Sequence, residues 1–209
     1  IQSFVTQETP MVRIHTDDGR IGTGYTYTIG TGGSSVIGLL KDHLCPRLIG
    51  RDPIHIEMLW KELFFATHAT AVGAITSLAL CAIDMALWDL KCLASGRPLW
   101  QEAGGAQASV PLYTTEGGWL HIDTSALVED ALKAKADGFG GSKIKIGRPH
   151  VSEDVARLGA VRAAVGPGFE IMTDANQAFT VSEAIRRARA YEGLDLAWFE
   201  EPVPAKDLG

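Results

Sequence analysis

Hydrophobic and polar residues follow two different patterns along the chain, and the pattern changes near residue 108. Before this point, apolar residues at 75, 78, 79, 82, 83, 86, 87 and 90 recur at the spacing of one helical face, so a helix is predicted over 75–90. After it, short runs rich in β-branched and aromatic residues alternate with helix-like stretches. We therefore expect two domains, residues 1–108 and 109–209.

The first domain opens with the pattern of a β-hairpin. Residues 11–16 contain β-branched residues, the polar run Asp17-Asp18-Gly19-Arg20 is typical of a turn, and residues 21–28 resume the strand pattern. An amphipathic stretch over 35–48 predicts another helix besides the one over 75–90. This combination indicates an α+β domain.

The second domain alternates strands with helices. The predicted strands are 110–115, 142–146, 170–174 and 196–200. The predicted helices are about 125–137, 152–165 and 181–192. Thr180 and Glu183 form a capping-box pattern before the last helix, and Ser152 precedes two acids in the first turn of the middle one. Because crossover helices join parallel strands, we predict a βαβαβαβ unit with a parallel sheet.

Ionisable residues lie at the C-terminal ends of three of these strands. The segments are Lys143-Ile144-Lys145, Asp174-Ala175-Asn176 and Glu200-Glu201-Pro202. Asp174 follows Lys145 by 29 residues and Glu200 follows Asp174 by 26, each about the length of a strand and its crossover helix. Because charged groups are costly to bury, this arrangement indicates a functional site at one edge of the sheet.

Lys143 and Lys145 are two residues apart in a strand, so their side chains are predicted to share one face while Ile144 and Ile146 share the other. The alternative is an exposed edge strand with two solvated lysines, which the flanking crossover helices make less favourable. Two ammonium groups this close repel each other, so we expect at least one lysine with a lowered pKa. A neutral lysine can act as a general base.

Asp174 and Glu200 are candidate ligands for a divalent cation. Hard oxygen ligands at matched strand ends suit such an ion, and Asn176 adds a neutral polar group on the same side as Asp174. The alternative for Asp174 alone is a turn or helix-capping role, and the matched position of Glu200 favours the metal. Alternation does not decide which of Glu200 and Glu201 faces the site.

Composition argues against several functions. The chain of 209 residues is 46% hydrophobic and 21% charged, an ordinary globular composition. Its net charge of −6 and lack of a Lys or Arg run argue against nucleic acid as a partner. Asp84 and Asp89 interrupt the longest apolar stretch, so we expect no membrane span. The three cysteines lack metal-ligand spacing, and a cytoplasmic location is expected.

Together these motifs resemble the enolase superfamily, in particular its mandelate racemase-like branch. The resemblance covers nearly the whole chain. It consists of Ala82-Ile83-Asp84-Met85-Ala86-Leu87-Trp88-Asp89, then Lys143-Ile144-Lys145, Asp174-Ala175-Asn176-Gln177 and Phe199-Glu200-Glu201-Pro202. It implies an α+β capping domain followed by a (β/α) barrel that forms the catalytic domain.

The resemblance also implies roles for these residues. Lys145 would be the base that removes the proton α to a carboxylate, and Lys143 would help to bind that carboxylate and to lower the pKa of its neighbour. Asp174 and Glu200 would bind Mg²⁺, with Glu200 preferred because the family's ligand is the first acid of the pair. Asn176 would contact the substrate or the metal shell.

Two further segments are similar to acid-sugar dehydratases of the galactarate and talarate type. They are Tyr113 to His121 and Tyr25-Thr26-Tyr27-Thr28, which would make Tyr113 and Tyr27 substrate-binding residues. The implied function is a Mg²⁺-dependent dehydratase, a carbon-oxygen lyase that eliminates a β-hydroxyl through an enolate. The alternatives are a racemase or epimerase of a 2-hydroxy acid, or an inactive truncated metal-binding relic. By analogy with the family, a homo-oligomer is expected.

The sequence departs from the family pattern in its extent. A complete (β/α) barrel has eight strands in about 250 residues, whereas the fourth predicted barrel strand here is followed by the last residue, Gly209. We therefore expect about half a barrel, without the third carboxylate ligand and the His-Asp pair that the resemblance implies. The start is expected to fall after the first strand of the capping domain.

Overall fold

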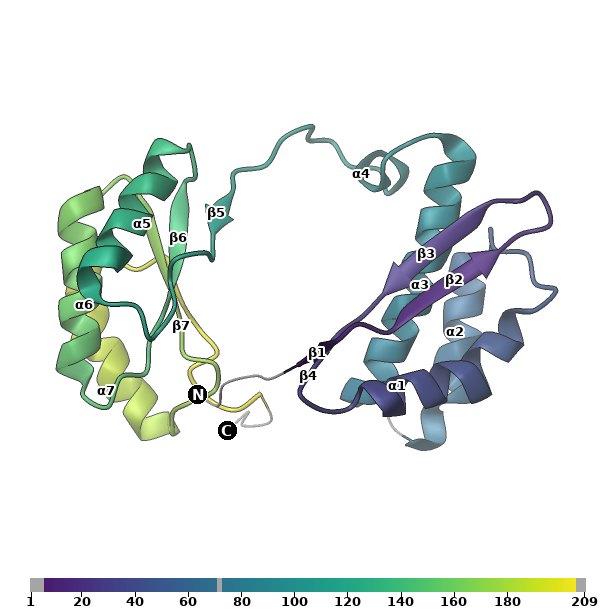
Figure 1. Cartoon of the computed structure of the whole chain (residues 1–209), viewed down its shortest axis with the longest axis horizontal. Helices are drawn as coiled ribbons and strands as arrows, with labels where there is room; N and C mark the ends of the chain where they lie inside the picture. The colour runs from purple at the N-terminus through teal and green to yellow at the C-terminus, as the bar shows by residue number, and fades with distance from the viewer. Residues whose placement is uncertain (1–5, 71–72, 206–209) are drawn as a thin grey trace. The chain divides into compact units, whose positions relative to one another are not determined.

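The computed structural model describes residues 6–70 and 73–205. The chain divides into two compact units, Ile1–Ala108 and Ser109–Gly209 (Figure 1). In the first unit, β2 (Met11–His15) and β3 (Ile21–Tyr25) pair as an antiparallel hairpin. The short strands β1 (Gln7–Glu8) and β4 (Thr28–Ile29) pair beside it. The predicted hairpin is confirmed, and Gly19 supplies the positive φ of 84° in its turn.

The hairpin packs on α3 (Ala74–Ser95), the helix predicted from the apolar pattern. The strand can approach the helix closely because two of its residues, Gly22 and Gly24, lack side chains. A Cβ at Gly24 would overlap the carbonyl oxygen of Ala82 and lie 2.5 Å from the amide nitrogen of Ala86. Close packing against the helix therefore explains the sequence pattern Gly-Thr-Gly.

The remaining helices of this unit differ from the predictions. The stretch over 35–48 is α1 (Gly33–Leu39), followed by a π-helical turn (Leu40–Leu44) and a 3₁₀ turn (Cys45–Leu48). Pro46 lacks the N–H that a continuous α-helix would use. Helix α2 (Ile56–Ala66), the 3₁₀ turn His68–Thr70 and α4 (Leu99–Glu102) were not predicted. Across the described ranges, none of the helices combines the length and apolar character needed to cross a membrane.

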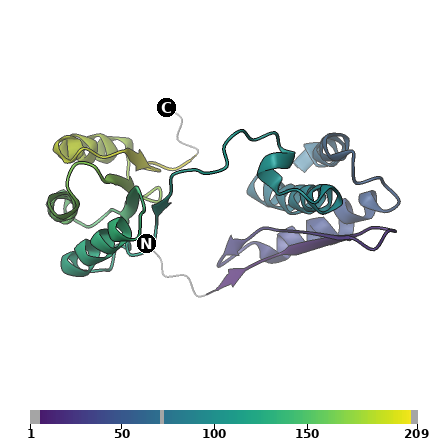
Figure 2. The same ribbon diagram turned by 90° about the horizontal axis from the view of Figure 1, so that it is seen from above.

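The second unit is a four-stranded parallel sheet in the order β5-β6-β7-β8, as predicted. Its strands are β5 (Tyr113–Thr114), β6 (Gly141–Lys145), β7 (Glu170–Asp174) and β8 (Trp198–Glu200). Its helices are α5 (Thr124–Ala136), α6 (Val151–Val165) and α7 (Val181–Tyr191), with a 3₁₀ turn at Glu192–Leu194. All three helices lie on the same side of the sheet (Figures 1 and 2).

The helix starts test two of the predicted caps. The Thr180 hydroxyl accepts a hydrogen bond from the Glu183 amide at 3.4 Å, as expected for a capping residue. The middle helix begins one residue earlier than predicted, and His150 caps it in place of Ser152. The His150 amide donates to the Glu153 carboxylate at 2.8 Å, which completes a capping box.

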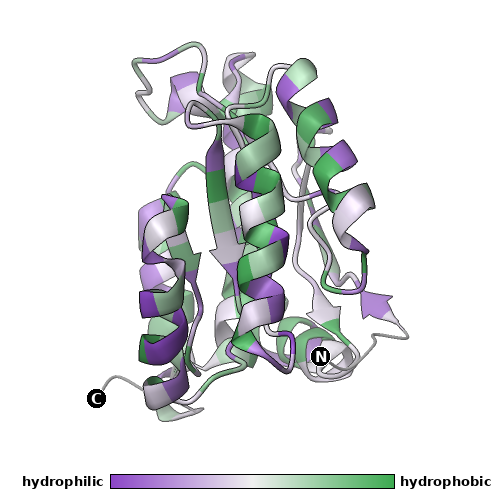
Figure 3. Cartoon of the chain, turned by 90° about the vertical axis from the view of Figure 1, so that its left-hand side faces the viewer, coloured by the Kyte–Doolittle hydropathy of each residue, from purple (hydrophilic) through white to green (hydrophobic). Residues whose placement is uncertain are grey.

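The core of the second unit lies between the sheet and these helices. Its most buried members include Ile144, Ile146, Leu158, Val161 and Ile171. Figure 3 shows hydrophilic and hydrophobic residues mixed along the helices that cover the sheet. The helices therefore cover one face of the sheet, and the polar residues at the strand ends do not belong to this core.

Candidate active site at the strand ends

The sheet register places the predicted site residues at one level. Lys145 of β6 is opposite Asp174 of β7, and Asp174 is opposite Glu200 of β8. These residues are the last of their strands, so the three side chains meet at the C-terminal edge of a parallel sheet. This is the edge at which (β/α) barrels place their catalytic groups.

The two lysines share one face of β6, as predicted. Ile144 and Ile146 on the other face are 1% and 0% exposed and pack under the helices. The side chains of Lys143 and Lys145 are 13% and 19% exposed, which is far too little for two solvated lysines of an edge strand. Strands β5 and β7 flank β6 on both sides. The edge-strand alternative is therefore wrong.

The lysines and acids converge in what we call the strand-end cluster: Lys143, Lys145, Asp174, Asn176 and Glu200. Lys143 Nζ lies 2.9 Å from Glu200 Oε1 and 3.4 Å from Asp174 Oδ2. Lys145 Nζ donates to Asp174 Oδ2 at 2.5 Å and to Asn176 Oδ1 at 2.7 Å. Asp174 thus lies between both ammonium groups, and Asn176 completes the surroundings of Lys145.

The surroundings of Lys143 favour its charged form. Burial disfavours its charged form, but the hydrogen bond to Glu200 and the charges of Glu200 and Asp174 outweigh burial and raise the pKa of Lys143. Burial likewise opposes the charge of Asp174, yet hydrogen bonds from Lys145 and from the Asn176 amide lower the pKa of Asp174. The expected repulsion between the lysines is offset because the carboxylates stand between them.

Glu200, and not Glu201, faces the lysines. Its other oxygen accepts a hydrogen bond from Trp198 Nε1 at 3.1 Å, which fixes the carboxylate plane. Glu201 has a positive φ of 44° and turns its carboxylate toward Asn176 and Gln177, with both contacts at 3.5 Å. The predicted choice of Glu200 therefore agrees with the side-chain directions.

The left-handed backbone at the end of β7 aims Asn176 at Lys145. Asn176 and Gln177 have φ values of 45° and 61°, a conformation that is costly for residues other than glycine. The Gln177 amide donates to the Glu201 carbonyl at 2.8 Å, and the Asn176 amide donates to Asp174 Oδ1 at 2.9 Å. These bonds stabilise the strained turn.

Asp174 and Glu200 offer hard carboxylate oxygens, the kind of ligand that Mg²⁺ takes. Their hard oxygens converge on one positive charge, the Lys143 ammonium, which already lies between the two carboxylates. Within the described ranges, His, Cys, Asp and Glu side chains form no group of three or more that could hold a metal ion. The two carboxylates would therefore be part of a coordination shell.

The two predicted tyrosines lie in different units. Tyr113 is the first residue of β5, and its ring meets the Trp198 ring edge-on at a centroid distance of 5.3 Å. Trp198 in turn binds Glu200, so Tyr113 is two contacts from a proposed metal ligand. Tyr27 lies between β3 and β4 of the first unit with an exposed side chain. Its substrate contact stays a prediction.

A buried ionic network beside the cluster was not predicted. Asp154 of α6, Arg157 of α6 and Arg187 of α7 are 0%, 4% and 3% exposed. Asp154 accepts from Arg187 at 2.6 Å and lies 3.7 Å from an Arg157 nitrogen. The sequence did carry a signal, because positions 154 and 157 belong to the same helical stripe as the core residues Leu158 and Val161. Charged residues in a core stripe indicate a specific role.

A hollow in the first unit lies away from these residues. It has a volume of about 890 Å³ and lies between β2 and the segment 45–53, with Leu59 and Leu87 among its lining residues. None of the residues of the strand-end cluster lines it. The site is therefore identified by converging side chains and not by the size of a cavity.

Family models match both parts of the chain. The model for the mandelate racemase / muconate lactonizing enzyme N-terminal domain matches residues 1–104, and that for the enolase C-terminal domain-like family matches residues 126–209. A 3,6-anhydro-alpha-L-galactonate cycloisomerase of Streptomyces coelicolor is 42% identical over 94% of this chain and 54% of its own length. An L-talarate/galactarate dehydratase of Salmonella typhimurium is 35% identical over 95% of this chain and 50% of its own length.

Solved structures give the same result. A racemase from Streptomyces coelicolor with bound magnesium superposes with a TM-score of 0.91 at 39% identity, covering 98% of this chain and 57% of that one. An L-talarate dehydratase from Polaromonas, complexed with Mg and L-glucarate, gives 0.89 at 35% identity, covering 96% and 56%. The chain spans about half the length of these relatives. The chain therefore belongs to the enolase superfamily, in its mandelate racemase / muconate lactonizing enzyme branch, as the sequence motifs indicated.

Proposed function

We propose that this chain supplies the base and two metal ligands of a Mg²⁺-dependent acid-sugar dehydratase, which removes the proton α to a carboxylate and eliminates a β-hydroxyl. The observation that carries the proposal is the convergence of two lysines on Asp174 and Glu200 at matched strand ends. The names of the relatives, which include an L-talarate/galactarate dehydratase and an arabinonate dehydratase, support an acid-sugar substrate.

The proton to be removed is very weakly acidic, so the site must hold the negative charge that develops on the substrate carboxylate. Mg²⁺, held by Asp174 and Glu200, would supply positive charge beside that carboxylate. Lys143 adds a second positive charge, because its Nζ lies 2.9 Å from Glu200 Oε1 and 3.4 Å from Asp174 Oδ2. Lys143 is therefore assigned to binding and charge stabilisation, and not to proton abstraction.

Lys145 is assigned as the base. As a neutral amine its Nζ can accept the α proton, and the ammonium that results is stabilised by Asp174 at 2.5 Å and Asn176 at 2.7 Å. Asp174 and Asn176 lie at the end of β7, where the Asn176 amide donates to Asp174 Oδ1. This hydrogen bond orients the carboxylate that binds the Lys145 amine. Asn176, Tyr113 and Tyr27 are proposed as substrate-binding residues.

A second candidate function is a racemase or a cycloisomerase acting on a related acid. Two relatives favour it, the Streptomyces coelicolor cycloisomerase and the magnesium-containing racemase structure. Such an enzyme would use the same base and the same metal ligands. Its product would be an isomer of the substrate, because no water is eliminated. A metal-binding relic without activity is the third candidate.

Proton exchange in deuterated water separates these functions. The full-length protein with Mg²⁺ would be incubated with galactarate, L-talarate and L-glucarate, and the products followed by NMR. A keto acid that has lost a hydroxyl supports the dehydratase, and α-deuteration with retention of all hydroxyls supports the racemase. Mg²⁺ binding without any exchange supports the relic and refutes the dehydratase.

The same assay tests Lys145. Lys145→Ala should lower α-proton exchange by roughly 10²- to 10⁴-fold, the usual contribution of a general base, while Mg²⁺ affinity changes little. Lys133→Ala is a matched control, because the Lys133 side chain is 73% exposed on α5. If Lys145→Ala exchanges the α proton as fast as this control, Lys145 is not the base.

A further inference from the structure

Arg157 reaches from the buried side of α6 to the main chain at the end of β6. Its side chain is 5% exposed. One terminal nitrogen, Nη1, donates to the Lys145 carbonyl at 3.1 Å, and the other, Nη2, donates to the Trp119 carbonyl at 3.2 Å. A single guanidinium therefore joins the last residue of β6 to the loop of residues 116–121 that follows β5.

The same loop holds the other side of Lys145. The Lys145 amide donates to the Gly118 carbonyl at 2.7 Å, beyond the last residue of β5. The loop can come this close because a Cβ at Gly118 would overlap the Lys143 carbonyl oxygen. The amide of Lys145 is thus held by the loop, and its carbonyl is held by Arg157.

The interior position of Arg157 is unfavourable by itself. Burial lowers the pKa of Arg157, the nearby Arg148 charge acts in the same direction, and Asp154 partly compensates. Its Nε has no hydrogen-bond partner among the described residues. A well-packed apolar residue is often as stabilising as a buried ion pair. We therefore attribute the presence of an arginine here to its hydrogen bonds with the Lys145 and Trp119 carbonyls, and not to a gain in stability.

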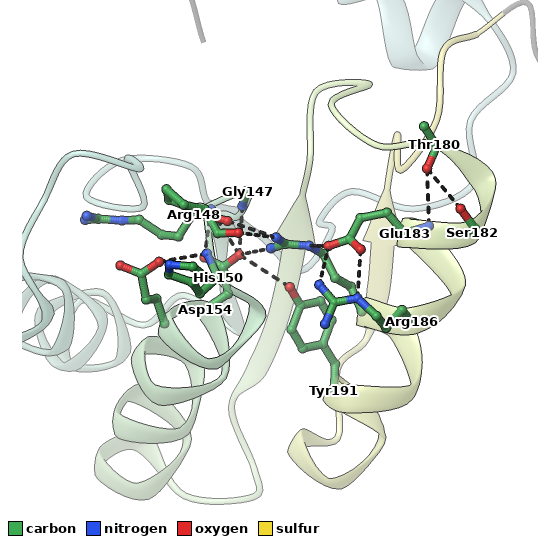
Figure 4. A network of polar contacts seen from close by, with 12 residues as sticks. Gly147, Arg148, His150, Asp154, Thr180, Ser182, Glu183, Arg186 and Tyr191 are labelled. Atoms are coloured by element: carbon green, nitrogen blue, oxygen red, sulfur yellow. Dashed lines mark hydrogen bonds and ion pairs between the residues drawn. The ribbon is translucent and has the colours of Figure 1, made fainter.

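Asp154, on the same helix as Arg157, binds the main chain just after Lys145. Its Oδ2 accepts from the amides of Gly147 and Arg148 at 2.9 and 3.2 Å, and Tyr191 approaches the same oxygen at 3.4 Å. Figure 4 shows Gly147, Arg148 and Tyr191 gathered around Asp154. The turn after β6 is thus fixed by the helix that also carries Arg157.

We propose that Arg157 is a positioning residue, which fixes the main chain of Lys145 and couples it to the loop of residues 116–121. The proposal rests on the function proposed above for the role of Lys145. A base must meet its proton within a narrow geometry, and a misplacement of about 1 Å can cost about 100-fold in rate. Beyond Lys145 the Ile146 amide still donates to the Asp174 carbonyl of β7 at 3.0 Å, but β5 pairs with β6 only as far as Ser142. The side of Lys145 that faces away from β7 is therefore held by the loop and by Arg157.

Three variants of the full-length protein test this role. Arg157→Met keeps the apolar stem and removes both donors, and Arg157→Lys keeps one charged donor. Arg162→Met is the matched control, because Arg162 lies on the same helix and also donates to backbone carbonyls. Its partners are Gly166, Phe169, Leu194 and Asp195, at the opposite ends of the strands.

The first readout is kinetic, with the rate of α-proton exchange measured on galactarate, L-talarate and L-glucarate. Arg157→Met should lower kcat by about 10- to 100-fold with little change in KM, and Arg157→Lys should recover part of the loss. Arg162→Met should keep kcat within about twofold once the folded fraction is accounted for. The proposal is overturned if folded Arg157→Met has the same kcat as the control. If Arg157→Met does not fold, the same comparison is made with Arg157→Lys.

The second readout does not depend on activity. Amide hydrogen exchange should become about tenfold faster in peptides covering 116–121 and 145–150 of Arg157→Met, and in peptides covering 166–170 and 193–196 of Arg162→Met. Unchanged protection of 116–121 and 145–150 overturns the proposal. If the wild-type protein exchanges no α proton of these acids, the proposed function fails, and this pattern still decides whether Arg157 holds Lys145.

Discussion

Replacing Asp154 with asparagine should destabilise the second unit strongly, although the two side chains have nearly the same size. Asp154 is fully buried and faces Arg187 at 2.6 Å and Arg157 at 3.7 Å. Its oxygens also accept from the amides of Gly147 and Arg148. Asparagine would remove the charge and turn one acceptor into a donor, which would then face groups that can only donate.

The loss of unfolding free energy depends on which charges stay compensated after the substitution. Removing one partner of a buried ion pair costs about 3–5 kcal/mol, because the other charge is left without compensation. Arg187 keeps a second carboxylate, Glu183 at 2.6 Å, whereas Arg157 has only Asp154 among its ion pairs in the described residues. Because Arg187, the nearer partner, keeps a carboxylate, we expect the lower end of the range, about 3 kcal/mol.

The assay is amide hydrogen exchange of the full-length protein in increasing urea, read from peptides of α6 and α7 so that it reports on this unit. The control is Asp137→Asn, which removes the exposed ion pair between Lys133 and Asp137 on α5 and should cause no measurable change. If Asp154→Asn unfolds at the same urea concentration as this control, the network does not stabilise the fold and the reasoning is refuted.

Three other outcomes concern the hairpin, the last helix and the metal ligands. Gly24→Ala should cost about 2 kcal/mol in chemical denaturation, because the new Cβ overlaps the Ala82 carbonyl oxygen, and wild-type stability would contradict that close approach. Hydrogen bonds from two arginines of α7 lower the pKa of Glu183 from 4.5 to about 2. Its ion pairs therefore stabilise fully above about pH 4.5 and are lost as the pH falls toward 2, so thermal unfolding of Glu183→Gln should depend less on pH in this window than the wild type. Asp174→Asn should weaken Mg²⁺ binding in titration calorimetry, and unchanged affinity would exclude Asp174 as a ligand.

Local periodicity was sufficient to predict the parallel sheet and the directions of the lysines. Alternation in β6 placed Ile144 and Ile146 in the core and the lysines on the opposite face, as the structure has them. Such patterns are reliable because one residue of slip would exchange the two faces. The long helix α3 was also predicted from a pattern, because apolar residues recur at helical spacing from 75 to 90.

Other features depend on groups that are distant in the sequence. Burial opposes the charge of Lys143, and its pKa is raised mainly by Glu200, which is 57 residues away, so the lysine pair alone does not reveal this partner. Helix α2 was missed because Trp60, Phe64 and Phe65 are exposed on a helix whose buried stripe is Ile56, Leu59 and Leu63. These exposed apolar residues widen the apolar pattern, although Glu57, Lys61 and Glu62 give the helix a polar side.

The contact of Gly118 with β6 bears on how this protein could be re-engineered toward other substrates. A mutational library of the loop after β5 should hold Gly117 and Gly118 constant, because side chains there would collide with Asp130 and with the Lys143 carbonyl. Substitutions belong at Glu116 and from Trp119 onward. At Trp119, Arg157 binds only the backbone carbonyl, so this hydrogen bond does not depend on the side chain. The main chain of Lys145, the base proposed above, would then keep its hydrogen bonds to Gly118 and Arg157.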